Sequence, residues 1–449
     1  MKLSPEGLLS RALPWLLLAA LWAAAPRTHA ALQGDVNLDG RVTVSDAVDL
    51  IRKMGGSFLP YDASYILSDI HPWNPTGEGF YQNGRWYLGN SFLNKGDVVE
   101  VLRVAVGLAP ARDVGPVVYT AAGTGPSYPN TDIDSKEGYG TDLFLFAPWE
   151  LDVSPAGYVY FTENNAHRVR VLSPTGSVWV LSGGPNPGFR DGPKNRARFK
   201  SPEGIALYRD GNLAVADTYN HAIRRVTVPW GDVTTLGGNG IPGYKDGPPS
   251  ESQFDEPNGV ATDPAGNVYV ADTKNNRIRK ITPDGMTATI AGDGEGGYTD
   301  GPALKARLYQ PTGVEFDPRD GGLFIADMGN SKIRKLTAAG ELVTVAGGGG
   351  SNRSGFKDGY GKDALFWNVY CIDLDPRGRL WIADWTNEAV RVMSPDGYVS
   401  TVAGSPPLGL RDGRGPNAKF FGLMSVRAAP NGLLYIADTD NQRIRILIP

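Results

Sequence analysis

Short runs of apolar residues, or of alternating apolar and polar residues, follow one another along most of the chain. A representative stretch holds four such runs, at residues 259–262, 267–271, 278–281 and 287–291. Between the runs lie segments such as 263–266 (Asp-Pro-Ala-Gly) and 283–285 (Pro-Asp-Gly), which are typical of tight turns. The pattern predicts four short β-strands joined by turns.

This four-strand pattern recurs six times with nearly constant spacing. Each copy begins with an acidic residue followed by Gly, at Glu137, Asp191, Asp246, Asp300, Asp358 and Asp412. A second acidic residue follows at Glu163, Asp217, Asp272, Asp327, Asp384 and Asp438. Seven residues after each of these stands an arginine, at Arg170, Arg224, Arg279, Arg334, Arg391 and Arg445. Self-similarity of this kind marks a repeat architecture, and four strands per unit predict the blades of a β-propeller.

The residue pattern of the repeat resembles that of the NHL-repeat family. The third copy shows it best, with Pro257-Asn258-Gly259-Val260, the strand 268–272 (Val-Tyr-Val-Ala-Asp) and the segment 275–279 (Asn-Asn-Arg-Ile-Arg). The resemblance implies an all-β fold, a six-bladed β-propeller over residues 113–449.

The sixth copy ends after its third strand, so its outer strand must come from elsewhere. Residues 115–123 read like the outer strand of the fifth copy, residues 397–404. We therefore expect residues 117–122 to close the ring as the outer strand of the last blade, which leaves no open sheet edge at the seam.

The recurring acids and arginines are expected to build the fold, because each is needed once per blade. His167 and His221 occupy one turn position that the other copies fill with Asn276, Ser331, Glu388 and Gln442. This variable position is not expected to form a three-histidine zinc site.

Composition and the first residues of the chain indicate where the protein is located and argue against some functions. The net charge of −4 and the lack of a basic block give no indication of nucleic-acid binding. Cys371 is the only cysteine, so the chain cannot form an internal disulfide. Residues 1–30 carry Lys2, Arg11, an apolar run and a small-residue end at Ala30, which predicts a signal peptide and export of the rest. A retained membrane anchor is the alternative; no span is expected after removal of the signal.

Residues 35–46 have the ligand spacing of a calcium loop. Hard Ca²⁺ prefers six to eight oxygen ligands, and Gly40 provides the sharp turn at the sixth position of the loop. The expected ligands are the side chains of Asp35, Asn37, Asp39 and Asp46 and the carbonyl of Arg41.

With Asp at its last position, this loop resembles one half of a type I dockerin, and residues 93–108, with Asp97, resemble the second half. The resemblance implies a small α-helical, dockerin-like calcium module at residues 31–112, with a cohesin-like protein as partner. A calcium-stabilised stalk is the alternative, because residues 72–89 interrupt the second calcium loop.

The blades differ most where their inner strands begin, in copies 5, 6 and 1. The larger residues at these positions are Trp149, Glu150, Trp367, Tyr370, Cys371, Met424 and Ser425. They predict a ligand patch suited to a sugar face or a peptide. The alternative is that they only fill a gap between blades.

Together these features predict a secreted, non-catalytic binding or scaffold protein. The competing interpretation is a lyase or a lactonase-like hydrolase, with a metal ion held at the channel mouth by carboxylates such as Glu150. Fold alone does not decide between the two.

Overall fold

The computed structural model describes residues 81–82, 85–88, 91–93, 116–125, 137–140, 143–348 and 354–449. The chain divides into two compact units, Met1–Gly115 and Pro116–Pro449. In the first unit the described residues form an antiparallel sheet of β1 (Tyr81–Gln82), β2 (Arg85–Leu88) and β3 (Ser91–Leu93). The predicted signal peptide, the calcium loop from Asp35 to Asp46 and the helices of the dockerin-like module lie outside the described residues.

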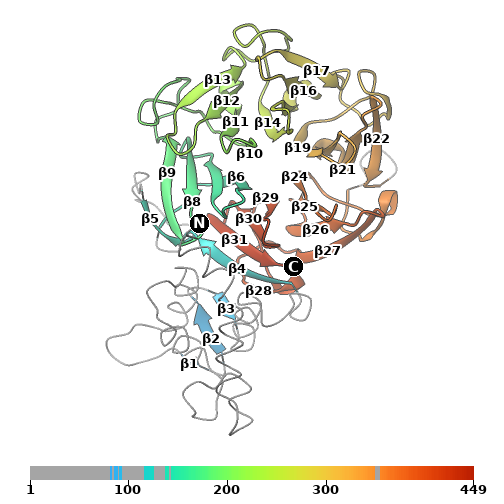
Figure 1. Cartoon of the computed structure of the whole chain (residues 1–449). Helices are drawn as coiled ribbons and strands as arrows, with labels where there is room; N and C mark the ends of the chain where they lie inside the picture. The colour runs from blue at the N-terminus through green and yellow to red at the C-terminus, as the bar shows by residue number, and fades with distance from the viewer. Residues whose placement is uncertain are drawn as a thin grey trace, which may run out of the picture. The chain divides into compact units, whose positions relative to one another are not determined.

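The described residues of the second unit form six antiparallel sheets arranged as the blades of a ring (Figure 1). Blade 1 contains β5 (Glu137–Tyr139), β6 (Pro148–Val153), β7 (Val159–Glu163), β8 (Arg168–Leu172) and β9 (Ser177–Gly183). Blade 2 contains β10 (Ile205–Leu207), β11 (Leu213–Asp217), β12 (Ala222–Val226) and β13 (Val233–Gly237). Blade 3 contains β14 (Pro257–Thr262), β15 (Val268–Asp272), β16 (Arg277–Ile281) and β17 (Thr287–Ala291).

The other three blades repeat this order. Blade 4 contains β18 (Gly301–Pro302), β19 (Pro311–Asp317), β20 (Gly322–Asp327), β21 (Lys332–Leu336) and β22 (Glu341–Ala346). Blade 5 contains β23 (Gly359–Tyr360), β24 (Val369–Leu374), β25 (Leu380–Asp384), β26 (Ala389–Met393) and β27 (Tyr398–Gly404). Blade 6 contains β28 (Gly413–Arg414), β29 (Leu423–Ala428), β30 (Leu434–Asp438), β31 (Arg443–Ile448) and β4 (Val117–Ala122).

Short 3₁₀ turns join some of the strands. They are η4 (Thr218–Asn220), η5 (Thr273–Asn275), η6 (Met328–Asn330), η7 (Gly361–Asp363) and η8 (Gly415–Asn417). No helix among the described residues is long and apolar enough to cross a membrane.

The inner strands β6, β10, β14, β19, β24 and β29 surround the centre of the ring in Figure 1. Blade 6 combines strands from the two ends of the second unit: β4 pairs antiparallel with β31, with Val117 opposite Ile448 and Tyr119 opposite Ile446. The strand order of this sheet is β28-β4-β31-β30-β29.

The core lies between neighbouring blades. Three residues before each inner strand begins, or before the equivalent position in blade 2, an apolar side chain is fully buried: Leu145, Phe199, Phe254, Leu308, Phe366 and Phe420. Full burial of such a side chain contributes about 1.5–3 kcal/mol. Apolar packing between neighbouring blades therefore holds the ring together.

The recurring arginine clamps each blade from within, and Arg279 of blade 3 shows how. Its Nη1 donates to Asp272 at 2.7 Å and to the carbonyl of Gln253 at 2.9 Å, while Nη2 donates to Asp246 at 2.5 Å. Its side chain is completely buried. The arginine thus ties the end of the second strand to the loop that leads into the blade.

The variable turn position links neighbouring blades. It has a left-handed backbone, as at His221 with φ of 52°. His221 Nδ1 accepts a hydrogen bond from the backbone N–H of Glu256 at 3.2 Å, and Asn276 Oδ1 accepts one from Gln310 at 2.9 Å. His167 Nδ1 likewise accepts from the N–H of Ser201 at 3.0 Å. Ser331 and Glu388 accept in the same way, so polar residues of different chemistry can serve as the acceptor at this position.

Candidate binding site at the channel mouth

Near the start of the inner strands, equivalent positions of the six blades form two successive rings of residues around the centre of the propeller, which we call the channel. The upper ring is Trp149, Glu203, Asn258, Thr312, Tyr370 and Met424, and the next is Glu150, Gly204, Gly259, Gly313, Cys371 and Ser425. We call the end of the channel at which these strands begin its mouth.

At the glycines of the second ring, the inner strand lies close to the backbone of the next blade. A Cβ atom on Gly204 would lie 2.2 Å from the carbonyl oxygen of Asn258, and one on Gly259 would lie 2.3 Å from that of Thr312. Blades 2 and 3 therefore have no room for a side chain here. At the same position of blades 1, 5 and 6, the buried side chains of Glu150, Cys371 and Ser425 are accommodated.

The structure brings several of the sequence-predicted patch residues into contact. Cys371 Sγ lies 3.8 Å from Glu150 Oε1 and 3.5 Å from Ser425 Oγ. Trp149 Nε1 donates a hydrogen bond to the hydroxyl of Tyr370 at 2.9 Å.

These residues differ in exposure. Glu150, Tyr370, Cys371, Met424 and Ser425 are buried in the channel wall, and Trp149 is partly exposed. Trp367 is 47% exposed and lies in the loop before β24, outside this group of contacts. Of the residues in the predicted patch, Trp149 and Trp367 are therefore the ones that offer exposed surface.

A buried polar network, which the sequence did not reveal, lies at the mouth beside Trp149. Glu203 accepts hydrogen bonds from the amide of Asn164 at 3.0 Å and from the hydroxyl of Tyr370 at 3.1 Å. The amide of Asn258 also donates to Glu203, and it donates to the Tyr370 hydroxyl at 2.7 Å. Burial raises the pKa of Glu203 to about 7.

Two tryptophan rings pack against the Tyr370 side of this network. Trp149 and Trp385 each stand roughly perpendicular to Tyr370, with ring centroids 5.9 Å from it. Both tryptophans are partly exposed. We call Asn164, Glu203, Asn258, Tyr370, Trp149 and Trp385 the mouth cluster.

Further along the channel a single arginine gathers four acidic side chains. Arg427 Nη1 donates to Asp373 and to Glu315, each at 2.9 Å, and its other nitrogens lie 3.4 Å from Glu150 and 3.6 Å from Asp152. Burial raises the pKa of Glu150 to about 8, although the positive charge of Arg427 opposes the shift. These contacts cross the ring and give the guanidinium a structural role.

Three large aromatic side chains are exposed at equivalent positions of blades 4, 5 and 6. Tyr309, Trp367 and Phe421 are 44%, 47% and 38% exposed. Each lies two residues before an inner strand and donates its backbone N–H, at 2.8 Å, to the second acidic residue of its own blade. The three therefore lie on the same face of the ring, and we call them the aromatic arc.

The fold does not require aromatic residues at this position, because blades 2 and 3 have Lys200 and Asp255 there. Comparison of this one position across the six copies could have revealed the arc from sequence. Only Trp367 was included in the predicted patch.

Within residues 116–125, 137–140, 143–348 and 354–449, no three His, Cys, Asp or Glu side chains are grouped to hold a metal ion. The predicted calcium ligands Asp35, Asn37, Asp39, Arg41 and Asp46 lie outside the described residues. His167 and His221 serve as the blade-to-blade acceptors already described.

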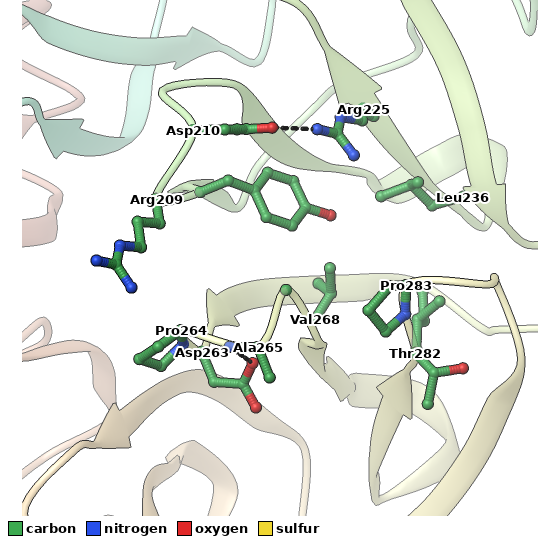
Figure 2. A pocket seen from close by; sticks show the side chains of 13 residues that line it. Arg209, Asp210, Arg225, Leu236, Asp263, Pro264, Ala265, Val268, Thr282 and Pro283 are labelled. Carbon is green, nitrogen blue, oxygen red and sulfur yellow. Dashed lines mark hydrogen bonds and ion pairs between the residues drawn. The ribbon is translucent and has the colours of Figure 1, made fainter.

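A cavity of about 220 Å³, separate from the mouth, lies between blades 2 and 3 (Figure 2). One side is formed by the turn after β10. There Asp210 Oδ2 forms an ion pair with Arg225 Nη2 at 2.5 Å, and the Arg225 guanidinium carbon lies 4.8 Å from the ring centroid of Tyr208. Pro264 and Pro283 lie on the opposite side. The charged groups of Asp210 and Arg225 are paired with each other, so we regard the mouth as the better candidate site.

Comparison with known proteins agrees with the repeat and the ring. The NHL repeat family matches residues 199–225 and 254–281. The chain is 30% identical over 274 residues to Protein SUPPRESSOR OF QUENCHING 1, chloroplastic, of Arabidopsis thaliana, covering 58% of this chain and 26% of that protein. It is 28% identical over 315 residues to human NHL repeat-containing protein 2, covering 63% and 43%. The matches thus span less than half the length of these relatives.

Among solved structures, a protein from Bacteroides ovatus described as an auxiliary nutrient binding protein superimposes with a TM-score of 0.56 at 19% identity. The likeness covers 74% of this chain and 76% of that one, and at this identity it shows the fold alone. With the six sheets described above, these matches identify the second unit as a six-bladed β-propeller that carries NHL repeats.

Proposed function

We propose that the protein is an exported binding protein whose propeller holds a glycan or peptide ligand on the face that carries the aromatic arc. The single observation that supports this function most strongly is the arc itself. Three large aromatic side chains are exposed in consecutive blades at a position where the fold accepts Lys or Asp. Exposed aromatic rings bind sugar faces and apolar peptide side chains, and they are enriched among the residues that dominate binding energy.

The mouth cluster extends this surface toward the channel. Trp149 and Trp385 are partly exposed, and Trp385 belongs to blade 5, like Trp367 of the arc. The B. ovatus structure of the same fold class is described as a nutrient binding protein, which is compatible with a binding role for such a ring.

The first unit has a supporting role in this proposal. Residues 31–112 form a dockerin-like module that binds calcium through Asp35, Asn37, Asp39, Arg41 and Asp46 and anchors the propeller to a cohesin-like or other protein partner. Residues 1–30 direct export. Both statements rest on the sequence patterns of these segments.

The purified protein should be screened on glycan and peptide arrays, beside a variant with Tyr309, Trp367 and Phe421 all changed to Ala. Trp230→Ala is the matched control, because Trp230 is 72% exposed and lies in the turn between β12 and β13. We expect the triple variant to lose the ligands that the unmodified protein and the control retain. Equal retention by all three proteins would refute the proposed face.

A further inference from the structure

Glu203 is a buried carboxylate whose hydrogen-bond partners are all uncharged. They are the side-chain amides of Asn164 and Asn258 and the hydroxyl of Tyr370. Among the residues that the structure describes, no Lys, Arg or His forms an ion pair with it, and the nearby charged residue that affects its pKa most is another acid, Glu256. Buried carboxylates normally have a cationic partner, because removing a charge from water is costly.

Asn258, beside it, has an unused acceptor. The residue is only 6% exposed, and its Oδ1 makes no hydrogen bond within the described part of the chain. The amide cannot simply turn over, because its nitrogen already donates to Glu203 and to Tyr370. The reversed amide would place an oxygen against the carboxylate. The site therefore holds one negative charge and, next to it, one carbonyl acceptor that has no donor in the described part of the chain. Both groups are buried, so a ligand that binds them must displace the side chains that cover them.

The rings of Trp149 and Trp385 lie on the Tyr370 side of the same network and are partly exposed. The faces of aromatic rings attract cations, tryptophan most strongly. The negative charge of Glu203, the unpaired Asn258 oxygen and the tryptophan rings would all be matched by one kind of group, a small cation that carries several N–H donors.

We infer that the mouth cluster binds a primary ammonium group of the ligand, such as the end of a lysine side chain or the amine of an amino sugar. One N–H of the ammonium group donates to Glu203 and another to Asn258 Oδ1, while the positive charge lies near the tryptophan rings. A neutral hydroxyl group could satisfy the acceptor but would leave the carboxylate without a counter-charge. A quaternary ammonium group has the charge but no donor. The inference deepens the proposed binding function and rests on it.

Ligand-observed saturation-transfer NMR on the purified protein tests this inference, with propylammonium chloride as the probe at pH 8 and constant ionic strength. Tetramethylammonium, 1-propanol and calcium chloride serve as comparison and competitor compounds. We expect propylammonium to bind more tightly than the other two organic probes. Glu203→Gln should weaken it about tenfold or more, because a charge-assisted hydrogen bond is lost.

Glu251→Gln is the matched control, since the Glu251 side chain is 56% exposed and, among the described residues, forms its ion pair with Lys245. Trp385→Ala provides a second variant, with an expected several-fold loss for propylammonium and no change for 1-propanol. Unchanged thermal midpoints in both variants confirm that they fold.

Equal binding of propylammonium and 1-propanol would overturn the inference, and so would unchanged binding in Glu203→Gln. The inference would also be overturned if micromolar calcium displaced propylammonium and the Glu203→Gln variant lost this effect, because the site would then bind a metal ion. If array ligands bind through the aromatic arc but show no dependence on Glu203, the ammonium site is wrong and the proposed function stands. If no array ligand depends on the aromatic arc while propylammonium binding still requires Glu203, the proposed function is wrong and the ammonium site stands.

Discussion

Replacing Arg427 with Met should destabilise the propeller more than almost any other single change in the channel. The substitution keeps much of the side-chain volume and removes the guanidinium that contacts Asp373 and Glu315 at 2.9 Å and lies near Glu150 and Asp152. Breaking a buried ion pair by removing one partner costs about 3–5 kcal/mol. We expect a loss of this size in the free energy of unfolding at pH 7.5.

The loss should shrink at lower pH, and its sign follows from proton binding. Burial already raises the pKa of Glu315 and of Asp373 above their usual values, and Arg427 opposes both shifts. Without Arg427, the folded protein binds more protons than the unfolded chain, whose carboxyl groups have pKa values of about 4. The stability of the variant therefore falls as the pH rises from about 5 to 8, relative to the unmodified protein.

Urea unfolding at pH 5.0, 6.5 and 7.5, followed by tryptophan fluorescence, measures both effects. Arg379→Met is the control, because Arg379 forms a partly exposed pair with Asp375 and should cost no more than about 1 kcal/mol. A loss below about 1 kcal/mol for Arg427→Met, or one that does not vary with pH, would refute the structural role assigned to this arginine.

Three further changes test other parts of the account. Glu150→Gln should reduce the decline in the free energy of unfolding between pH 5 and 8. The pKa of Glu150 is raised to about 8, so in this pH range the folded protein keeps a proton on Glu150 that the unfolded chain releases. The same decline in a denaturation series of the variant would contradict this prediction. Gly259→Ala should cost about 1–3 kcal/mol in urea unfolding, because its Cβ would lie 2.3 Å from the carbonyl oxygen of Thr312, whereas Gly184→Ala has open space and should cost far less; equal losses would refute the close approach. Asp35→Ala should abolish calcium uptake by the first unit in isothermal titration, and uptake equal to that of the unmodified protein would defeat the proposed loop.

The repeat could be predicted from sequence because each feature it encodes is local. The spacing from Asp272 to Arg279 brings the pair together across one hairpin, and the structure shows this contact at 2.7 Å. The turn position of His167 and His221 was likewise recognised as variable. Its role as a blade-to-blade acceptor emerged only once neighbouring blades were placed side by side.

The mouth cluster could not be predicted because its members are far apart in the sequence. Glu203 and Tyr370 are 167 positions apart, and Asn258 and Tyr370 are 112 positions apart. Only closure of the ring brings them within hydrogen-bonding distance. Sequence comparison between copies found Tyr370 and Trp149 as unusual residues, but it took Glu203 and Asn258 as unremarkable.

Burial was the second property that the sequence did not provide. A large residue at an inner-strand start can face the channel mouth or fill the space between strands, and Cys371 and Met424 do the latter. The width of that space depends on the packing of all six blades. The exposed aromatic residues lie two or three positions earlier, in loops such as the one that holds Trp367.

The most direct test of the account is the dissociation constant of the best array ligand for the unmodified protein and for Trp367→Ala. The arc predicts a loss of about tenfold, equivalent to about 1.4 kcal/mol, from removal of one stacked ring. Trp230→Ala should leave the constant unchanged. An unchanged constant in Trp367→Ala, also in combination with Tyr309→Ala and Phe421→Ala, would show that the ligand binds elsewhere on the protein.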